Sequence, residues 1–158
     1  MKKIIIFGGI IIVLFAAIAF LTSYQSQQQS EGNPFGKDRL HSETIDQLDD
    51  PVYQNIILPE ELDEKLEAGE TATIYFYSGQ CEYCVEASPI VVPKAEELGV
   101  NLELYNILEF EQGWGDYGIE STPSIVHYEN GEEKGRIVGL HDEETYEQFF
   151  QQVVQAEE

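Results

Sequence analysis

An uncharged apolar run from Ile4 to Leu21 divides this chain into two regions that need different surroundings. A run of this length can cross a hydrocarbon layer of roughly 30 Å as a helix. Lys2 and Lys3 precede it, and no further basic residue occurs before Lys37. Because basic residues beside a span stay on the cytoplasmic side, residues 1–3 are expected in the cytoplasm. The run therefore predicts a single-pass protein of the cell membrane whose C-terminal domain is extracytoplasmic.

The same run also resembles the apolar part of a cleavable signal peptide. Residues 17–19 (Ala-Ile-Ala) have the small-residue spacing that a signal peptidase recognises. The run is longer than the roughly 7 to 15 apolar residues usual in a signal peptide, however, and Phe20 and Leu21 continue it past that point. We therefore expect residues 4–21 to be an uncleaved transmembrane anchor.

The composition changes twice after the apolar run. Residues 22–36 are rich in Gln and Ser and include Gly32, Pro34 and Gly36, a composition typical of a flexible linker. Residues 37–158 contain apolar residues in helical and strand patterns, and their number suits one domain. We expect a single folded domain held off the membrane by a tether.

The exported part is strongly acidic. Over the whole chain, 8 Lys and Arg residues stand against 30 Asp and Glu residues, which gives a formal charge of −22. Lys2 and Lys3 contribute +2, so the chain after the apolar run carries −24. A surface of this sign repels phosphate backbones, and nucleic-acid partners are not expected.

Helical and strand patterns alternate along the exported domain. We predict a helix from Pro59 that ends at Gly69, a buried strand at Thr71–Tyr77, a helix at Val85–Leu98, a strand at Leu102–Ile107, a short helix or loop at Glu109–Tyr117, strands at Ser124–Tyr128 and Arg136–Val138 joined by a turn at Asn130–Gly131, and a final helix whose core stripe is Tyr146, Phe149, Phe150, Val153 and Val154. This order predicts an α/β fold with a mixed central sheet flanked by helices.

Both cysteines of the chain lie where the buried strand gives way to a helix, in the sequence Cys81-Glu82-Tyr83-Cys84. A thiolate at a helix N-terminus faces unpaired N–H groups and the positive end of the helix dipole. We therefore expect Cys81 to be the attacking thiolate. Cys84, one turn later, is placed to attack a mixed disulfide at Cys81 and release the product.

Two other interpretations of the cysteine pair remain open. A zinc site needs two further ligands, and His41, His127 and His141 do not form a second closely spaced pair, so no metal is expected. A purely structural disulfide suits an exported protein, but closing so short a loop removes little entropy from the unfolded chain.

The chain resembles membrane-anchored extracytoplasmic thiol-disulfide oxidoreductases of the thioredoxin family over residues Leu58 to Val154. The resemblance is carried by the strand Ile74–Tyr77 before the Cys81–Cys84 motif, by Pro89 in the following helix, by Tyr117-Gly118-Ile119 ahead of Thr122-Pro123, by Asn130-Gly131, and by Gly139. It implies a thioredoxin fold and a redox-active Cys81–Cys84 disulfide with no other cofactor. It also implies that Pro123 is cis and that the Thr122 backbone lies against the sulfurs and binds substrate.

The sequence departs from the family pattern around the motif. Gln80 stands where thioredoxins have Trp, and Glu82 and Tyr83 stand where they have Gly-Pro. Tyr75 takes the place of a buried acid, so the proton acceptor for Cys84 is not evident. Glu82 or Glu86 is a candidate proton relay acting through water, with solvated surface carboxylates as the alternative.

The intervening pair lacks the His typical of strong oxidases, which favours reduction over oxidation or isomerisation of disulfides. The expected partners are exported proteins with cysteines or disulfides and a membrane or thioredoxin-type protein that recycles the pair. The alternative is a non-catalytic binding module of the same fold, such as a metallochaperone or a transport accessory protein. Copper delivery would favour additional Met or His ligands, and Met1 is the only methionine.

Overall fold

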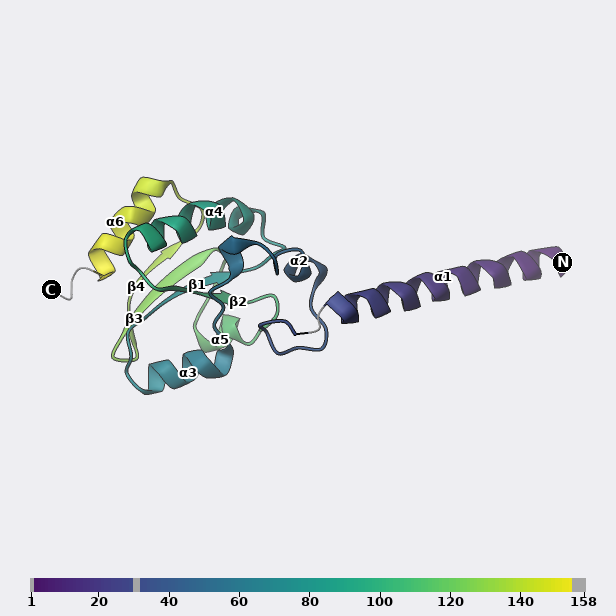
Figure 1. Ribbon diagram of the computed structural model, residues 1–158, viewed down its shortest axis with the longest axis horizontal. Helices are drawn as coiled ribbons and strands as arrows, with labels where there is room; N and C mark the ends of the chain where they lie inside the picture. The colour runs from purple at the N-terminus through teal and green to yellow at the C-terminus, as the bar shows by residue number, and fades with distance from the viewer. Residues whose placement is uncertain (1, 30–31, 155–158) are drawn as a thin grey trace.

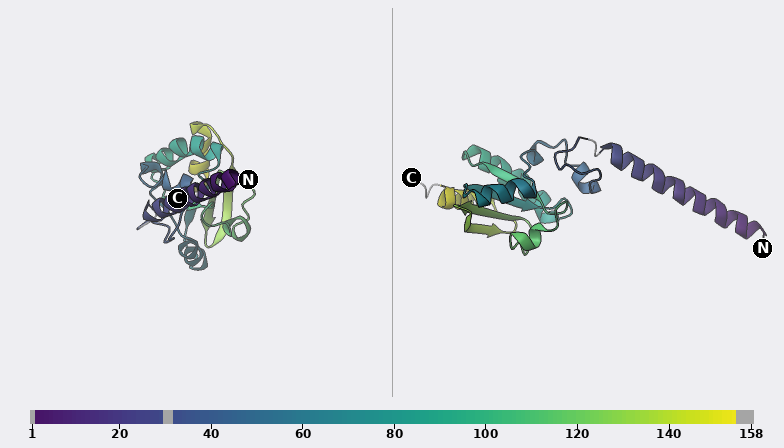
Figure 2. Two further views of the ribbon diagram at one scale, coloured as in Figure 1. Left: turned by 90° about the vertical axis from the view of Figure 1, so that its right-hand side faces the viewer. Right: turned by 90° about the horizontal axis from the view of Figure 1, so that it is seen from below.

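The structure is a computed structural model that describes the backbone of residues 2–29 and 32–154 (Figure 1). The first helix, α1 (Lys2–Gln29), extends away from a folded domain that contains all the other elements (Figures 1 and 2). Within α1, Ile6–Tyr24 has a mean hydropathy of 2.5 and none of it is buried. Among the described residues this is the one helix long and apolar enough to span a membrane.

Residues 22–36, which the sequence predicts as a flexible linker, have defined structure wherever they are described. Residues 22–29 continue α1, because Gln is a good helix former and no Gly or Pro interrupts them. The description resumes at residue 32, and residues 32–36 lie on the domain. Phe35 is buried, and the side-chain amide of Asn33 donates to the carbonyl of Lys37. The described residues of 22–36 are therefore helix or packed segment, in contrast to the predicted tether.

The domain alternates helices and strands as the sequence predicts. Its elements are α2 (Ser42–Ile45), a 3₁₀ turn η1 (Pro51–Tyr53), α3 (Pro59–Glu67), β1 (Ala72–Tyr77), α4 (Glu82–Glu97), β2 (Leu102–Asn106), α5 (Gly113–Asp116), β3 (Ser124–Glu129), β4 (Glu132–Val138) and α6 (Glu143–Val154). Elements α2 and η1 were not predicted; they precede the helix from Pro59, which is the first element that the sequence predicted within the domain.

The four strands form one mixed sheet in the order β2-β1-β3-β4. Strand β1 pairs with β2 in parallel and with β3 antiparallel, and β3 forms a hairpin with β4. The hairpin turn has positive φ at Asn130 (53°) and Gly131 (76°), as the Asn-Gly pair predicts. Every residue of β1 is buried, since helices cover both faces of the sheet.

Alternate residues of β1 enter two separate cores. Tyr75 and Tyr77 pack on the face covered by α4 and α6, where Cys84 is buried. Ile74 and Phe76 pack on the opposite face, which α3 and α5 cover (Figure 1). The predicted mixed sheet flanked by helices is confirmed, and both cysteines lie where β1 leads into α4.

Candidate active site

The turn after β1 places Cys81 at the start of α4. Residues 78–80 reverse the chain, and Cys81 adopts an extended conformation as the N-terminal cap of the helix. Its sulfur accepts a hydrogen bond from the backbone N–H of Cys84 over 3.1 Å. Cys81 is partly exposed to solvent. A thiolate at this position is stabilised by a donor of the first helical turn, which also donates to the backbone carbonyl of Cys81 over 3.0 Å.

Cys84 occupies a different environment although it lies only one turn away. Its side chain is fully buried against Ala87 and Val91 in the core under α4. Burial, together with the hydrogen bond to Cys81, raises the pKa of the Cys84 thiol to about 12. Both cysteines are free thiols in the structure, so the site is described in its reduced form.

The loop before β3 completes the site. Because β3 pairs with β1 in the register Phe76↔Ser124, the end of β1 and the start of β3 lie side by side. The Thr122–Pro123 peptide bond is cis, and the carbonyl oxygen of Thr122 lies 3.4 Å from the sulfur of Cys81. The structure therefore brings Thr122 and Pro123 to the exposed cysteine, although 41 positions separate Thr122 from Cys81 in sequence.

A hydroxyl network lies behind Cys84. Tyr75 has no exposed surface, and its hydroxyl lies 3.0 Å from the hydroxyl oxygen of Ser88. The Ser88 hydroxyl donates to the carbonyl of Cys84 over 2.7 Å. Burial raises the pKa of Tyr75 far above its usual value, so this network is neutral. Sequence reasoning missed Ser88, which its i+4 spacing from Cys84 on a predicted helix would have indicated.

The two candidate relay carboxylates do not lie beside the buried thiol. Glu82 and Glu86 are both exposed on α4. Among the described residues, the hydrogen bonds of the two thiols involve each other's groups, Thr122 and the backbone of Ser78, and neither Glu takes part. Tyr117, which precedes the Thr122 loop, is buried in the core under α5, and Trp114 is exposed.

A segment that the sequence did not assign lies against the active-site turn. We call residues 33–53, from Asn33 to the end of η1, the flanking segment. Gly79 packs so closely against it that a Cβ at this glycine would lie 2.9 Å from the Cβ of Glu43. The side-chain amide of Gln80 donates to the carboxylate of Glu43 over 3.3 Å. The residue directly before Cys81 thus contacts the flanking segment.

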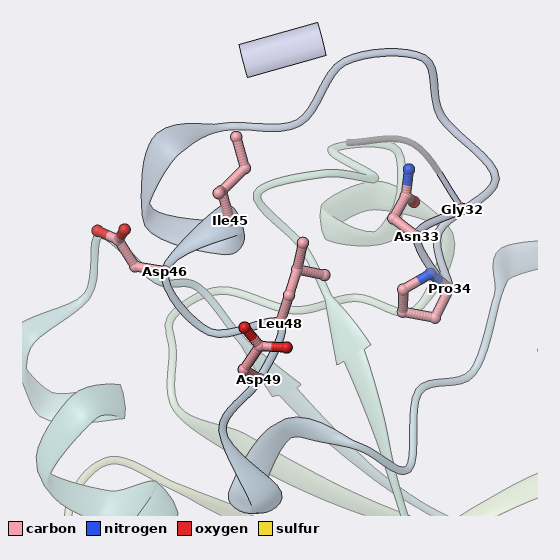
Figure 3. Close-up of a pocket in the computed structure, with 7 residues that line it drawn as sticks. All are labelled: Gly32, Asn33, Pro34, Ile45, Asp46, Leu48 and Asp49. Carbon is pink, nitrogen blue, oxygen red and sulfur yellow. The ribbon is translucent and has the colours of Figure 1, made fainter. Parts of the chain in front are cut away.

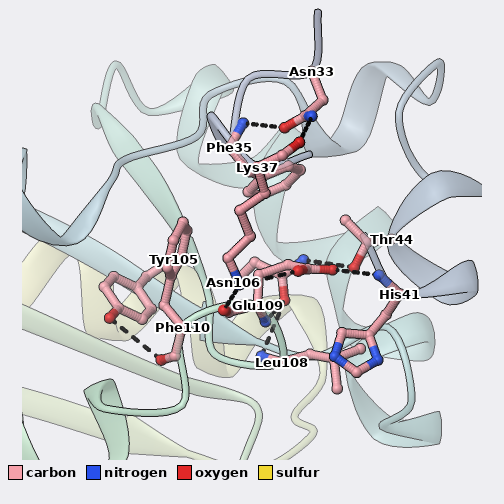
Figure 4. Close-up of polar contacts among 10 residues, drawn as sticks. All are labelled: Asn33, Phe35, Lys37, His41, Thr44, Tyr105, Asn106, Leu108, Glu109 and Phe110. Carbon is pink, nitrogen blue, oxygen red and sulfur yellow. Dashed lines mark hydrogen bonds and ion pairs between the residues drawn. The ribbon is translucent and has the colours of Figure 1, made fainter. Parts of the chain in front are cut away.

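Polar contacts to the end of β2 and the loop after it hold the flanking segment in place (Figure 4). The carboxylate of Glu109 is 1% exposed and forms an ion pair with Lys37. It also accepts a hydrogen bond from the backbone N–H of His41 over 2.8 Å. The side-chain amide of Asn106 donates to the hydroxyl of Thr44 over 3.2 Å. Residues 106–109 therefore hold the flanking segment at three of its residues, Lys37, His41 and Thr44.

A separate hollow lies within and beside the flanking segment (Figure 3). Its volume is about 560 Å³, and its lining includes Pro34, Leu48 and the carboxylates of Asp46 and Asp49. None of its lining residues belongs to the turn or loop that carry Cys81 and Thr122. Within residues 2–29 and 32–154, no group of three or more His, Cys, Asp or Glu side chains is placed to hold a metal ion.

Comparison with known proteins places this site in a family. The thioredoxin family model matches residues 54–152, which is more than half of the chain. The chain belongs to the thioredoxin family. It is 31% identical over 85 residues to the thioredoxin of Rickettsia bellii (strain RML369-C), a match that covers 52% of this chain and 81% of that protein. It is 30% identical over 84 residues to the thioredoxin of Rickettsia conorii (strain ATCC VR-613 / Malish 7), covering 52% and 80%.

Solved thioredoxin structures share the fold. A mutant thioredoxin from Halobacterium salinarum NRC-1 superposes with a TM-score of 0.54 at 23% identity, over 62% of this chain and 87% of that one. The thioredoxin from Aeropyrum pernix gives a TM-score of 0.51 at 21% identity, over 61% and 84%. Membership of the thioredoxin family makes this chain a thiol-disulfide oxidoreductase at the family level. The family match begins at residue 54, so α1 and the flanking segment lie outside it.

Proposed function

We propose that this protein is a membrane-anchored thiol-disulfide oxidoreductase that reduces disulfides of exported proteins through Cys81 and Cys84. The observation that carries the proposal is the asymmetry of the pair at the start of α4. Cys81 is accessible and its sulfur accepts a helix N–H, whereas Cys84 is buried and protonated directly behind it. Such a pair attacks with one thiol and resolves with the other.

The reaction takes place in two exchange steps. The Cys81 thiolate attacks one sulfur of the partner's disulfide, forming a mixed disulfide while the partner's other sulfur leaves as a thiolate. Cys84 then gives its proton to the partner's departed thiolate, directly or through water, and attacks the sulfur of Cys81. The bond between Cys81 and the partner breaks, and the partner's remaining sulfur leaves as a thiolate that water protonates. The partner disulfide gains two electrons and becomes a dithiol, and the Cys81–Cys84 dithiol becomes a disulfide. The carbonyl of Thr122, 3.4 Å from the attacking sulfur, lies where an extended partner segment would be held.

The charges around Cys81 support reduction as the direction of transfer. Glu82 and Tyr83 stand between the cysteines, so the pair lacks a His whose positive charge would stabilise a thiolate on Cys81. A dithiol whose thiolate is not strongly stabilised gives up its electrons more readily than that of a strong oxidant. After full equilibration with glutathione buffers, we expect a midpoint potential more negative than about −200 mV. A midpoint near about −120 mV would reverse the proposed direction.

The proposed location rests on α1 and its flanking charges. Ile6–Tyr24 is apolar enough to span a membrane, and Lys2 and Lys3 favour a cytoplasmic position for the residues before it. Labelling of Cys81 in intact cells with a membrane-impermeant maleimide tests this orientation. We expect labelling without cell lysis. Labelling that requires lysis would place the domain on the other side.

The activity is tested with the full chain in uncharged detergent micelles. The reduced protein is mixed with insulin, and the oxidation of its Cys81 and Cys84 thiols is measured in a single turnover. We expect one insulin disulfide to be reduced for each Cys81–Cys84 pair, and no reduction by Cys81→Ser. The matched variant Cys84→Ser retains the attacking thiol and should form the mixed disulfide without releasing it. Unchanged reduction by Cys81→Ser would refute the proposal.

A further inference from the structure

The flanking segment adds a wall beside the exchange cysteine that lies outside the family match. The end of β2 and the loop after it hold this segment in position (Figure 4). The buried Glu109 carboxylate pairs with Lys37 and accepts from the His41 backbone N–H, and Asn106 donates to the Thr44 hydroxyl. On its other side the segment abuts Gly79 and Gln80. A partner segment that approaches Cys81 therefore meets this wall as well as the Thr122 loop.

Glu43 is the charged residue that the wall presents to the active-site turn. It is partly exposed, and its carboxylate accepts from the Gln80 amide over 3.3 Å and from the Ser42 hydroxyl over 2.9 Å. Its own backbone N–H and the Ser42 hydroxyl hold the pKa of this carboxyl below its usual value. Glu43 is therefore ionised. The side chains that form hydrogen bonds with its carboxylate, Gln80 and Ser42, are neutral, and His41 also lowers its pKa electrostatically.

In the described part of the chain, no Lys or Arg residue forms an ion pair with Glu43. The Lys and Arg residues with an ion pair contact other carboxylates: Lys37 contacts Glu109, Lys65 contacts Glu103, Lys94 contacts Glu97, Glu143 and Glu147, Lys134 contacts Glu132, and Arg136 contacts Glu133. Arg39 donates to the hydroxyl of Ser23. Glu82, directly after Cys81 in sequence, adds an exposed carboxylate at the start of α4.

We propose that Glu43 is a specificity-determining residue that favours partners with a Lys or Arg next to the exchanged cysteine. The inference rests on the proposed function, because it concerns which disulfides Cys81 attacks. A basic side chain beside the partner's sulfur would meet Glu43 across Gln80, whereas an acidic one would be repelled by Glu43 and Glu82 together. One such charge, partly screened by solvent, changes a rate by about two- to three-fold.

The test uses the full reduced chain in uncharged detergent micelles and two synthetic peptides. Each peptide has one cysteine joined to 2-mercaptoethanol by a disulfide, and the residues on both sides of the cysteine are Lys in one peptide and Glu in the other. Cys81 attacks this disulfide, Cys84 closes the protein disulfide, and the peptide thiol and 2-mercaptoethanol are released. The second-order rate constant is measured for each peptide in about 0.02 M and about 0.5 M NaCl, because salt screens exposed charges.

The ratio of the Lys-peptide rate to the Glu-peptide rate is the readout. We expect the wild-type ratio to exceed one at low salt and to fall toward one at high salt. Glu43→Gln should lower the low-salt ratio by about two- to three-fold, and Glu43→Lys should lower it further. The control is Glu67→Gln, which makes the same charge change at the exposed end of α3, on the opposite face of the sheet from α4.

The outcomes separate this inference from the proposed function. If both peptides are reduced and Glu43→Gln leaves the ratio at its wild-type value, Glu43 does not determine specificity and the proposed function stands. If Glu67→Gln lowers the ratio as much as Glu43→Gln, the preference comes from net charge and the assignment to Glu43 is overturned. If the wild-type protein reduces neither peptide, both proposals fail.

Discussion

The backbone N–H of Cys84 donates a hydrogen bond of 3.1 Å to the sulfur of Cys81. This bond makes the first cysteine the N-terminal cap of the helix that carries the second. Oxygen-bearing side chains usually supply such caps, so here a thiol takes their place and shares the N–H with the backbone carbonyl of Cys81, 3.0 Å away. The side chain of Cys84 has no exposed surface. The two thiols therefore differ in access and in charge stabilisation although they lie within one helical turn.

Removing the buried thiol should trap partners on the exposed one. In Cys84→Ala, Cys81 still attacks a partner disulfide, but no second thiol is in place to release the product. We expect mixed disulfides with exported proteins to accumulate in cells and to disappear on reduction, as seen by non-reducing electrophoresis and mass spectrometry. Cys81→Ala serves as the matched control and should form none. Adducts at Cys84 in that control would contradict the assigned roles.

The raised pKa of Cys84 predicts a loss of stability in alkali. The folded protein holds the thiol proton up to about pH 12, whereas the unfolded chain releases it near its ordinary pKa of 9.0. The stabilising contribution is therefore complete below about pH 9 and is lost as the pH rises toward 12. Between about pH 9 and 10 the reduced protein should lose about 1 kcal/mol more unfolding free energy than Cys84→Ala. Urea unfolding at each pH measures this difference, and parallel profiles for the two proteins would contradict it.

Much of the site was predictable because its signals are local. The buried strand predicted at Thr71–Tyr77, the break at residues 78–80 and the helix after Cys81 follow one another within a short stretch, as β1 and α4 do in the structure. Apolar continuity, turn residues and helical spacing therefore indicated where the cysteines lie. Thr122–Pro123 is distant in sequence, and only the family resemblance connected it with Cys81.

The flanking segment was not predictable because long-range contacts hold it. Lys37 reaches Glu109 across 72 positions, and His41 reaches it across 68. No periodicity in residues 33–53 indicates such pairing, since its helical pieces α2 and η1 are each a single turn. Residues 22–29 were not predictable for a different reason. Their Gln-rich composition suits a linker and a continued helix equally well.

The Tyr75 hydroxyl should contribute to stability through Ser88. Tyr75→Phe removes one partner of the Ser88 hydroxyl and leaves the ring in the core, so we expect a loss of about 1 kcal/mol in unfolding free energy. Tyr83→Phe is the control, because Tyr83 is 64% exposed and its change should be near zero. Equal effects in the two variants, measured by urea unfolding, would argue against a stabilising hydroxyl pair.

The ion pair between Lys37 and Glu109 should matter more than surface pairs. Lys37→Met leaves a carboxylate that is 1% exposed without its cation, but Lys37 itself is 35% exposed, so water offsets part of the loss. We expect a destabilisation of about 1–3 kcal/mol. Lys134→Met, which breaks an exposed pair with Glu132, should cost less than about 0.5 kcal/mol. Adding Glu109→Gln to Lys37→Met removes the stranded charge, so the double variant should lose less than the sum of the single changes.

Gly131 should tolerate a side chain less well than another glycine with similar backbone angles. Gly131 and Gly99 have φ of 76° and 71°, so alanine at either position adopts a left-handed conformation that costs about 1 kcal/mol. A Cβ at Gly99 meets no atom within 4 Å, whereas one at Gly131 collides with the backbone carbonyl of Leu66 at the end of α3. That carbonyl cannot rotate away as a side chain does, so the hairpin must move off α3. We expect Gly131→Ala to lose at least about 2 kcal/mol in urea unfolding and Gly99→Ala about half of that. Similar losses in the two variants would show that the β3–β4 turn does not pack tightly on α3.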